Sequence, residues 1–167
     1  MEQHKRVGAR WFAVACAVGI GGTALMSTAA ASSEPAGVTR GVLTPFAAGI
    51  RGSVSGLAQM VRNASGSTIV SLHVEGLVPG GSYASHVHAA PCAIGSADGH
   101  YKHDPAGPAT PPNEIWLNGG PFVANSGGIA NSQAVADFTA GTNAVSVVVH
   151  DLSLPSTANK VACADLG

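Results

Sequence analysis

Two histidines have the spacing of side chains that could share one metal ion, and a third ends another predicted strand. His86 and His88 are two residues apart in a segment of strand character, so their side chains leave the same face of a strand. His150 ends the run 144–150, in which three valines alternate toward a core and leave the histidine on the opposite face. We therefore expect the rings of His86 and His88 to be able to reach one ion together. The alternative is a set of solvated strand histidines, because an isolated His-x-His motif is a weak signal.

Short strand-like runs between glycine-rich turns would position these rings. Polar and apolar residues alternate with a period of two over residues 67–77, which predicts a half-buried strand. No helical pattern of ten residues competes with these runs. Further strands are predicted at residues 52–60, 83–89, 134–139, 144–150 and 161–166. Repeated short strands of this kind indicate an all-β sandwich or barrel of Greek-key type.

The segment 91–121 differs from its surroundings because prolines and glycines interrupt any periodicity. Its prolines are at positions 91, 105, 108, 111, 112 and 121. A loop of this length without periodicity is usually either functional or disordered. The presence of Cys92, His100, His103 and Trp116 favours an ordered, functional loop.

The first 33 residues have the layout of a secretory signal peptide. Lys5, Arg6 and Arg10 precede an uncharged apolar run over residues 11–26, and small residues follow it. Two alternatives stay open: a retained membrane anchor, although the run is shorter than the roughly 20 residues of a span, and a lipid attached at Cys16. Export predicts a secreted or extracytoplasmic location, in the periplasm or cell envelope, with membrane contact only if the leader is retained or lipidated.

The exported part is expected to form one domain with one pair of cysteines. Residues 34–44 are interpreted as a linker and residues 45–167 as the folded domain. Loss of the leader removes Cys16 and leaves Cys92 and Cys163, which outside the cytoplasm suggests a disulfide, with two buried free thiols as the alternative. Only 10% of the residues are charged and no basic cluster is interleaved with aromatic residues, so a nucleic-acid surface is not supported.

Five separate segments of the chain form a larger pattern. They are residues 74–88 (VEGLVPGGSYASHVH), Cys92, residues 98–101 (DGHY), residues 147–151 (VVVHD) and residues 160–167 (KVACADLG). In this order they resemble the copper/zinc superoxide dismutase family, and the resemblance extends over residues 67–167. It implies an all-β fold of about eight antiparallel strands, a Greek-key β-barrel or flattened sandwich with long loops.

The resemblance implies a role for four histidines. His86, His88 and His150 match the copper ligands of the family, and His100 matches the histidine that bridges copper and zinc. Copper is therefore the implied cofactor. In the family's reaction His100 would release copper and carry a proton during the reduced half of the cycle.

The resemblance also implies a disulfide between Cys92 and Cys163 and a catalytic role for a lysine. Lys160 takes the place of the family's active-site arginine, three residues before the last cysteine. A lysine can attract superoxide as a point charge, but it cannot make the planar two-pronged contact of an arginine. Because the loop after His150 is short and carries little charge, we expect slower anion capture than in a fully steered enzyme.

Most of the family's zinc ligands are missing from this sequence. Trp116 stands where the family has an aspartate, and Asn113 stands where it has a histidine. His103 and Asp104 could be offered as substitutes, but with His100 committed to copper they supply two ligands, whereas a structural zinc site normally has four. The resemblance thus gives copper without a complete zinc site.

These losses resemble the copper-only branch of the family, in which an acidic residue orients the histidine that zinc would have held. Glu114 is the candidate for this role beside His100. A metal-bound imidazole usually gives its second ring nitrogen to a carboxylate or carbonyl, which fixes its tautomer. The alternative for Glu114 is a solvated loop acid.

The function expected from this pattern is copper-dependent conversion of superoxide to oxygen and hydrogen peroxide outside the cytoplasm. A second hypothesis is an extracytoplasmic copper-binding or copper-buffering protein on the same fold without useful turnover, because fold alone does not confer function. A third is a structural sandwich that holds no metal. The sequence leaves the oligomeric state open.

Overall fold

The computed structural model describes residues 36–46 and 53–167 of the chain. In these residues nearly all regular structure is antiparallel β, with two single turns of 3-10 helix, so the predicted all-β class is confirmed. The signal peptide predicted for residues 1–33 lies outside the described residues. No helix in the described ranges is both long and apolar enough to cross a membrane.

Eight strands and two short helical turns follow one another along the described part of the chain. They are β1 (Gly37–Pro45), β2 (Ser55–Arg62), β3 (Thr68–Glu75), β4 (Ser82–His88), η1 (Gly95–Ala97), η2 (Leu117–Gly119), β5 (Phe122–Val123), β6 (Ala130–Ala136), β7 (Ser146–Asp151) and β8 (Lys160–Asp165). The strand order in the sheet is β5-β4-β7-β8-β1-β2-β3-β6. Strands distant in sequence are therefore neighbours at three places, as the long connections of a Greek-key barrel require.

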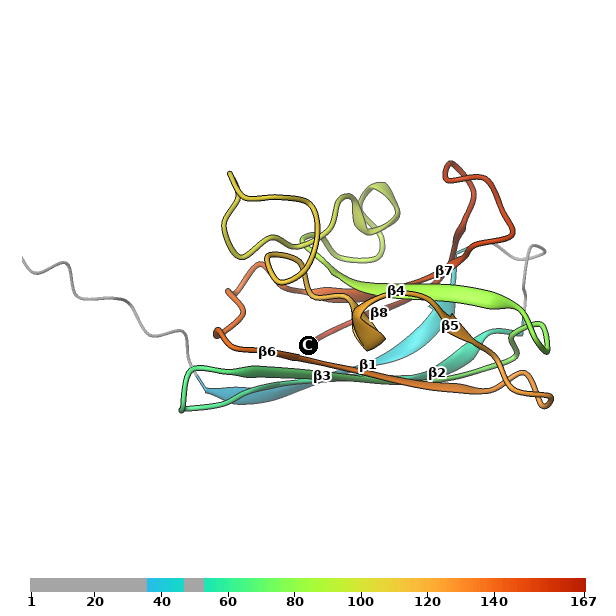
Figure 1. The fold of residues 1–167 in the computed structure, drawn as a ribbon, viewed down its shortest axis with the longest axis horizontal. Coiled ribbons are helices and arrows are strands. Elements are labelled where there is room, and N and C mark those ends of the chain that lie inside the picture. Colours follow the sequence, from blue (N-terminus) through green and yellow to red (C-terminus); the bar gives the residue numbers. More distant parts are fainter. Residues whose placement is uncertain (1–35, 47–52) are drawn as a thin grey trace, which may run out of the picture. The chain divides into compact units, whose positions relative to one another are not determined.

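The eight strands form two layers, one of β5, β4, β7 and β8 and one of β1, β2, β3 and β6 (Figure 1). Strand β1 belongs to both layers. Its first residues pair with β2, whereas Thr44 and Pro45 pair with Cys163 and Ala162 of β8. The sheet thus turns from one layer to the other at β1, and the long loop between β4 and β5 lies over the outer side of the β4 layer (Figure 1).

The core lies between the two layers and is filled by inward-facing apolar residues. Met60, Val70, Tyr83, Val147 and Val149 are all fully buried in it. The predicted alternation of β7 is confirmed: Val147 and Val149 lie in the core, whereas Val148 faces outward and packs with Ala97 and Cys163 in a second, smaller cluster. The outer face of the β4 layer is therefore covered by the loop as well.

Strand β1 corrects the predicted linker. Residues 34–44 were expected to connect the leader to the domain, but the chain is paired in β1 from Gly37 onward, so the domain begins before position 45. The valines of this strand point to solvent, with Val38 55% and Val42 68% exposed, while only Leu43 among its apolar residues enters the core. The strand therefore lacks the sequence signature of apolar residues on the buried face.

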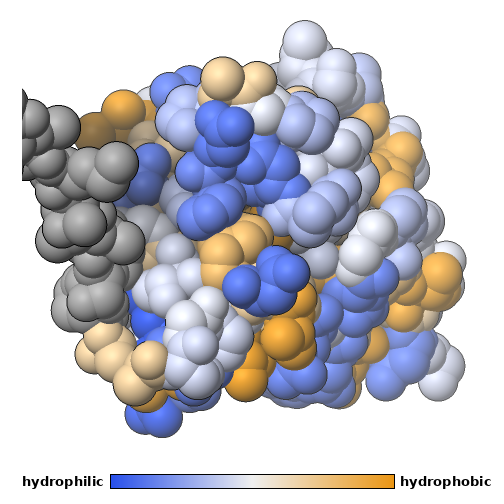
Figure 2. Space-filling view, turned by 60° about the vertical axis from the view of Figure 1, so that its left-hand side comes forward, coloured by the Kyte–Doolittle hydropathy of each residue, from blue (hydrophilic) through white to orange (hydrophobic). Residues whose placement is uncertain are grey.

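Two further strands differ from the sequence-based expectation. The strand predicted at residues 134–139 is β6 at Ala130–Ala136. The two-residue strand β5 at Phe122–Val123 was not predicted. In β6 the inward positions hold small residues, whereas Val135 points outward and is 70% exposed. Figure 2 shows one face of the protein on which apolar side chains reach the surface in groups separated by polar ones.

Arg62 at the end of β2 ties the connection between β6 and β7 to the opposite layer. Its Nε donates to the carbonyl oxygen of Ala140 at 2.8 Å, and Nη2 donates to those of Gly141 and Ala144, both at 3.1 Å. Guanidinium groups suit such a contact because they offer several donors in a fixed plane. The connection is thereby fixed at the point where the chain enters β7.

Candidate metal centre

Adjacent strands carry three of the four histidines on the outer face of their layer. Strand β4 holds His86 and His88, two residues apart and on the same side, as their spacing predicts. Strand β7 pairs with β4 so that Val148 lies opposite His86 and His150 lies opposite Ala84. His150 is thus the diagonal neighbour of His86, and a diagonal pair lies within reach of a ring side chain.

The long loop supplies the fourth histidine by adding short stretches of backbone to the free edge of β4. The amide of Ala89 donates to the carbonyl of Gly99 at 3.1 Å, and the amide of Tyr101 donates to the carbonyl of Val87 at 2.9 Å. His100 lies between these two contacts and forms an isolated β-bridge with His88. The loop is therefore ordered here, as predicted, and holds His100 in register with β4.

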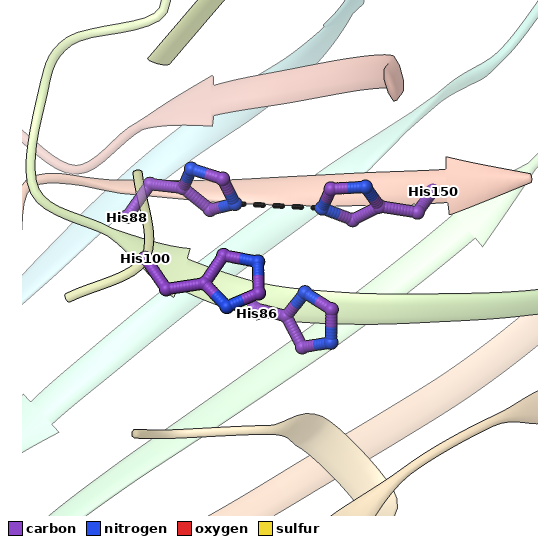
Figure 3. A group of neighbouring side chains, drawn as sticks. All are labelled: His86, His88, His100 and His150. Carbon is purple, nitrogen blue, oxygen red and sulfur yellow. Dashed lines mark hydrogen bonds between the residues drawn. The ribbon is translucent and has the colours of Figure 1, made fainter. Parts of the chain in front are cut away.

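The four rings gather at one place, as Figure 3 shows. Ring centroids are 4.2 Å apart for His86 and His100, 4.9 Å for His86 and His150, and 4.9 Å for His88 and His100. Each ring offers one nitrogen to a group in which all four atoms lie within 4.8 Å of one another. The cluster could therefore bind a metal ion, and solvated, separate histidines are excluded.

The Nδ1 atoms of His88 and His150 are hydrogen-bonded to groups outside the cluster. Nδ1 of His88 lies 3.2 Å from the carbonyl oxygens of Ala97 and Asp98, and Nδ1 of His150 lies 3.2 Å from Oδ1 of Asn159. A carbonyl oxygen only accepts, so His88 carries its proton on Nδ1 and keeps a lone pair on Nε2. The Nε2 atoms of His88 and His150 lie 3.4 Å apart (Figure 3).

His86 presents the opposite nitrogen. Its Nδ1 is buried and has no hydrogen-bond partner among the described residues. Its ring packs on the indole of Trp116, with centroids 4.8 Å apart. A buried polar atom without a partner is unfavourable, and a metal ion among the four rings would satisfy it. The donor set is thus one Nδ1 and three Nε2 atoms, which fits a cation that prefers imidazole.

Burial keeps the rings of His86, His88 and His150 neutral. Desolvation, followed by repulsion from the neighbouring histidines, lowers the pKa of His86 to about 2 and that of His88 to about 3. Desolvation also lowers the pKa of His150 to about 4, against the opposing effect of its hydrogen bond with Asn159. Neutral imidazole is the form that binds metal, so at neutral pH no proton must leave these three rings before an ion enters.

Glu114 holds the second nitrogen of His100. Its Oε2 accepts a hydrogen bond from Nδ1 of His100 at 2.7 Å and another from Nε1 of Trp116, also at 2.7 Å. The glutamate is 4% exposed, which excludes the solvated loop acid considered from the sequence. The hydrogen bond places the proton of His100 on Nδ1 and leaves Nε2 for an ion.

Sequence reasoning took Trp116 as one sign of an ordered loop but missed its contacts with Glu114 and His86. The indole both donates to Glu114 and covers the ring of His86. A signal was present, because residues 114 and 116 are two apart in an extended segment and so share a face. Its backbone also forms a β-bridge with His86, so the same short segment places the indole and the carboxylate.

Lys160 begins β8 beside His150, with which it is paired in the β7–β8 register. Its Nζ donates to the carbonyl oxygens of Ser96 at 2.8 Å and Asp98 at 2.6 Å. Partial burial lowers the pKa of the lysine, against a smaller opposing effect of the Asp98 carboxylate. The ammonium is therefore held near the cluster by the same loop that supplies acceptors to His88.

A disulfide joins Cys92 to Cys163, as predicted, with an S–S distance of 2.06 Å. This bond fixes the loop after β4 onto the outer face of β8 and excludes two free thiols. The amide of Cys92 also donates to Oδ1 of Asp165 at 2.7 Å. The grouping of these cysteines with Asp165 is thus a structural link, because neither sulfur is available as a thiolate ligand.

The substitutes considered for zinc lie elsewhere. The ring of His103 stacks on Phe138, with centroids 4.0 Å apart. Oδ1 of Asp104 accepts a hydrogen bond from the amide of Ala106 at 2.9 Å, within a turn of the loop. In the part of the chain that the structure describes, neither joins a group of potential metal ligands. His73 lies on the other layer and binds Asn131.

We expect the metal-free protein to lose stability as the pH falls from about 7.5 to 5.5. An unfolded histidine takes up a proton near pH 6.5, whereas burial lowers the pKa values of His86, His88 and His150 to about 2, 3 and 4. Below pH 6.5 the unfolded chain binds more protons, so its free energy falls relative to the folded state. Thermal unfolding followed by circular dichroism measures the effect. His86→Gln should reduce the pH dependence, and a Tm that stays constant over this range would contradict the prediction.

Comparison of the chain with models of known protein families and with curated proteins finds no match. The centre is therefore characterised by its own geometry: four imidazoles, a buried carboxylate hydrogen-bonded to one of them, and an ammonium beside two of them. Three of these rings come from the two central strands of one layer, and the fourth comes from a loop joined to the edge of that layer.

Proposed function

We propose that this protein is a copper-dependent superoxide dismutase that acts outside the cytoplasm and converts superoxide to oxygen and hydrogen peroxide. The observation that carries the proposal is the cluster of four imidazoles with one potential ligand atom each, all within 4.8 Å of one another. The order of the sequence motifs, which resembles the copper/zinc superoxide dismutase family, points to the same chemistry. The disulfide favours an oxidising compartment.

Copper fits the donor set better than the other common cations do. The four potential ligands are all imidazole nitrogens, and copper(II) binds such sites more tightly than other divalent first-row metals. Nδ1 of His86 and Nε2 of His88, His100 and His150 would hold the ion. When bound, copper supplies one-electron chemistry, in which one superoxide acts as the reductant and the next as the oxidant.

His100 is suited to carry the proton that peroxide formation needs. Its side chain is 29% exposed, whereas His88 is 1% and His150 6% exposed, so His100 has the readiest contact with solvent. The hydrogen bond to Glu114 keeps a proton on Nδ1. Exchange with solvent is thereby confined to Nε2, the nitrogen that faces the cluster, and a proton held there lies beside the reacting oxygen species.

Lys160 is suited to attract the anion without binding it tightly. Its ammonium is beside His88 and His150, where a positive charge raises the local concentration of superoxide. The carbonyl oxygens of Ser96 and Asp98 hold the ammonium in place. It can therefore act as a fixed point charge beside the cluster rather than as a mobile ligand.

Pulse radiolysis of the copper-loaded protein tests the proposal. We expect superoxide to decay in a catalytic process whose rate is proportional to the concentration of protein, after all loosely held copper has been removed by dialysis. Apoprotein passed through the same dialysis without copper is the control. A decay no faster than that given by an equal amount of free aqueous copper would exclude enzymatic dismutation.

We expect Lys160→Gln to lower the second-order rate constant by roughly tenfold and to weaken its dependence on ionic strength. The reason is that the variant loses the positive charge beside two of the ring side chains while keeping a group that can bond to the same carbonyl oxygens. Lys160→Arg keeps the charge and should retain most of the rate. Equal rates for the glutamine variant and the parent at low salt would show that Lys160 does not attract the substrate.

A copper-binding protein without useful turnover is the second candidate. It is favoured by the burial of the site, since His86 is 8%, His88 1% and His150 6% exposed and Trp116 covers one of these rings. An enclosed site is suited to retention. Tight binding of one copper ion per chain together with the absence of catalysis in the same pulse radiolysis experiment would favour this function over the first.

A further inference from the structure

Within the described residues, strand β6 has an unpaired edge, because it is the last strand in the sheet order. Gln133 lies opposite Ser71 of β3, but its amide donates to Oδ1 of Asn118 instead of to β3. Gln133 and Ser71 are therefore a non-hydrogen-bonded pair, in which the backbone N–H and C=O of Gln133 point away from β3. These pairs alternate along an antiparallel ladder. The N–H and C=O of Val135, two residues further on, therefore also point to the free edge.

No hydrogen bond outside the β3–β6 ladder engages the backbone of Val135 in residues 36–46 and 53–167. The strand thus presents one free donor and one free acceptor at a surface position. Exposed strand edges of this kind are templates for pairing with another extended chain, and proteins usually protect them. Here the sequence places neither a lysine nor a proline on the edge itself.

A groove runs along this edge. One part, with a volume of about 500 Å³, lies between Val135 and a wall that includes Pro111, Pro112 and Trp116. Prolines have no N–H, so this wall has fewer donors with which to close the edge by backbone hydrogen bonds. The wall does offer apolar surface, against which a side chain of an added strand could pack.

The groove continues past Asp137 into a second part of about 460 Å³. Asp137 and Pro112 line both parts, and the stacked rings of His103 and Phe138 line the second. We call the two parts together the β6 groove. An extended chain, which advances about 3.3 Å per residue, would pass from one part to the other beside Asp137.

The β6 groove is acidic. Its ionisable lining residues in the described structure are His103, Asp104, Glu114 and Asp137. Glu114 is already hydrogen-bonded to His100 and Trp116, whereas Asp137 is exposed at the junction of the two parts. Among the residues that the structure describes, no lysine or arginine lines either part, so the groove favours a cationic occupant.

We propose that the β6 groove docks an extended, basic segment of another protein by strand addition. The backbone of that segment pairs with Val135, an apolar side chain packs against Pro111 and Pro112, and a lysine or arginine lies beside Asp137. Main-chain hydrogen bonds supply affinity in this mode of recognition, and alternate side chains supply specificity. The proposal does not depend on the bound metal or on the reaction.

A second copy of this chain is a poorer occupant of the groove. Pairing two β6 edges about a two-fold axis would bring the same acidic residues of both copies, including Asp137, into one interface, and like charges across an interface are unfavourable. The proline wall would also stand beside the edge in both copies. A basic peptide meets neither obstacle.

The test uses the 15N-labelled protein and a capped octapeptide of alternating valine and lysine. We expect the amide resonances of Val135 and Asp137 and the indole resonance of Trp116 to shift on titration. A peptide with glutamate in place of lysine should bind at least about tenfold more weakly, and so should one whose valine amides are methylated on the pairing edge. Equal binding of the methylated peptide would overturn strand addition.

Two charge reversals complete the test. Asp137→Lys should weaken binding of the basic peptide by about tenfold or more. Glu75→Lys, on the neighbouring strand β3 but at the end of the strands away from Asp137, is the matched control and should leave binding unchanged. The proposal is overturned if the two variants lose affinity equally or if no resonance of β6 shifts. It is also overturned if Val135 shifts with protein concentration in the absence of peptide, because the occupant would then be a second copy.

Discussion

Replacing His150 with alanine should give a folded protein that no longer retains copper during dialysis against a chelator. Nε2 of His150 lies 3.4 Å from Nε2 of His88, and the four potential ligand atoms all lie within 4.8 Å of one another. Removal of one of the four rings leaves an incomplete site. Since loss of a residue that only supports a ligand typically weakens metal affinity by 10 to 100-fold, we expect loss of a ligand to weaken it by at least about 100-fold. Copper content by mass spectrometry measures the effect.

The matched control for this variant is His73→Ala. His73 lies on the other layer, its side chain is 45% exposed, and it binds Asn131 and Glu75 rather than the cluster. Its removal should leave copper content unchanged. Circular dichroism checks that both variants fold. One copper ion retained per chain by the folded His150→Ala variant would contradict the four-histidine site and, with it, the proposed dismutase.

Removing the disulfide should have the largest effect on stability. Cys92 and Cys163 are 71 positions apart, and a cross-link over a loop of this length stabilises a folded chain by about 4 kcal/mol in the chain-entropy description. We therefore expect the double variant with serine at both positions to unfold at a much lower denaturant concentration. Unfolding in urea, followed by circular dichroism, measures the difference in the free energy of unfolding.

The same variant should also loosen the metal centre. The disulfide holds the loop that carries residues 96–98. The carbonyl oxygens of Ala97 and Asp98 accept from Nδ1 of His88. Those of Ser96 and Asp98 accept from Nζ of Lys160. Adding a reductant to the parent protein should reproduce the loss of stability, whereas it should not affect the double variant. An unchanged urea midpoint in both experiments would show that packing alone holds the loop.

Sequence patterns predict a strand well where its apolar residues face the core. Residues 67–77 alternate with a period of two, and the structure has β3 at Thr68–Glu75. In β1 the pattern is reversed, because its valines point outward, and in β6 small residues point inward. A further reason in β1 is Gly41, where a Cβ would collide with the carbonyl oxygen of Asp165. Such a close approach of two backbone segments depends on the assembled fold and leaves no periodic signal.

The candidate site was predictable in its ligands and less so in their surroundings. The spacing of His86 and His88 placed both on one face, and the resemblance added His100 and Glu114. Neither could show that the indole of Trp116 donates to Glu114, because the contact depends on how the loop meets the edge of β4. The acceptors of Lys160 could not be predicted either, since they are backbone oxygens of a segment 62 to 64 residues away.

Arg62 restricts sliding of the two layers past each other. Its guanidinium bonds to three carbonyl oxygens in the connection that enters β7, the strand that carries His150. Sliding of β7 relative to the opposite layer would have to break these contacts together, so a single side chain from the far layer couples the two mechanically. The ring of His150 thus keeps its alignment partly through Arg62, a residue that makes no contact with it.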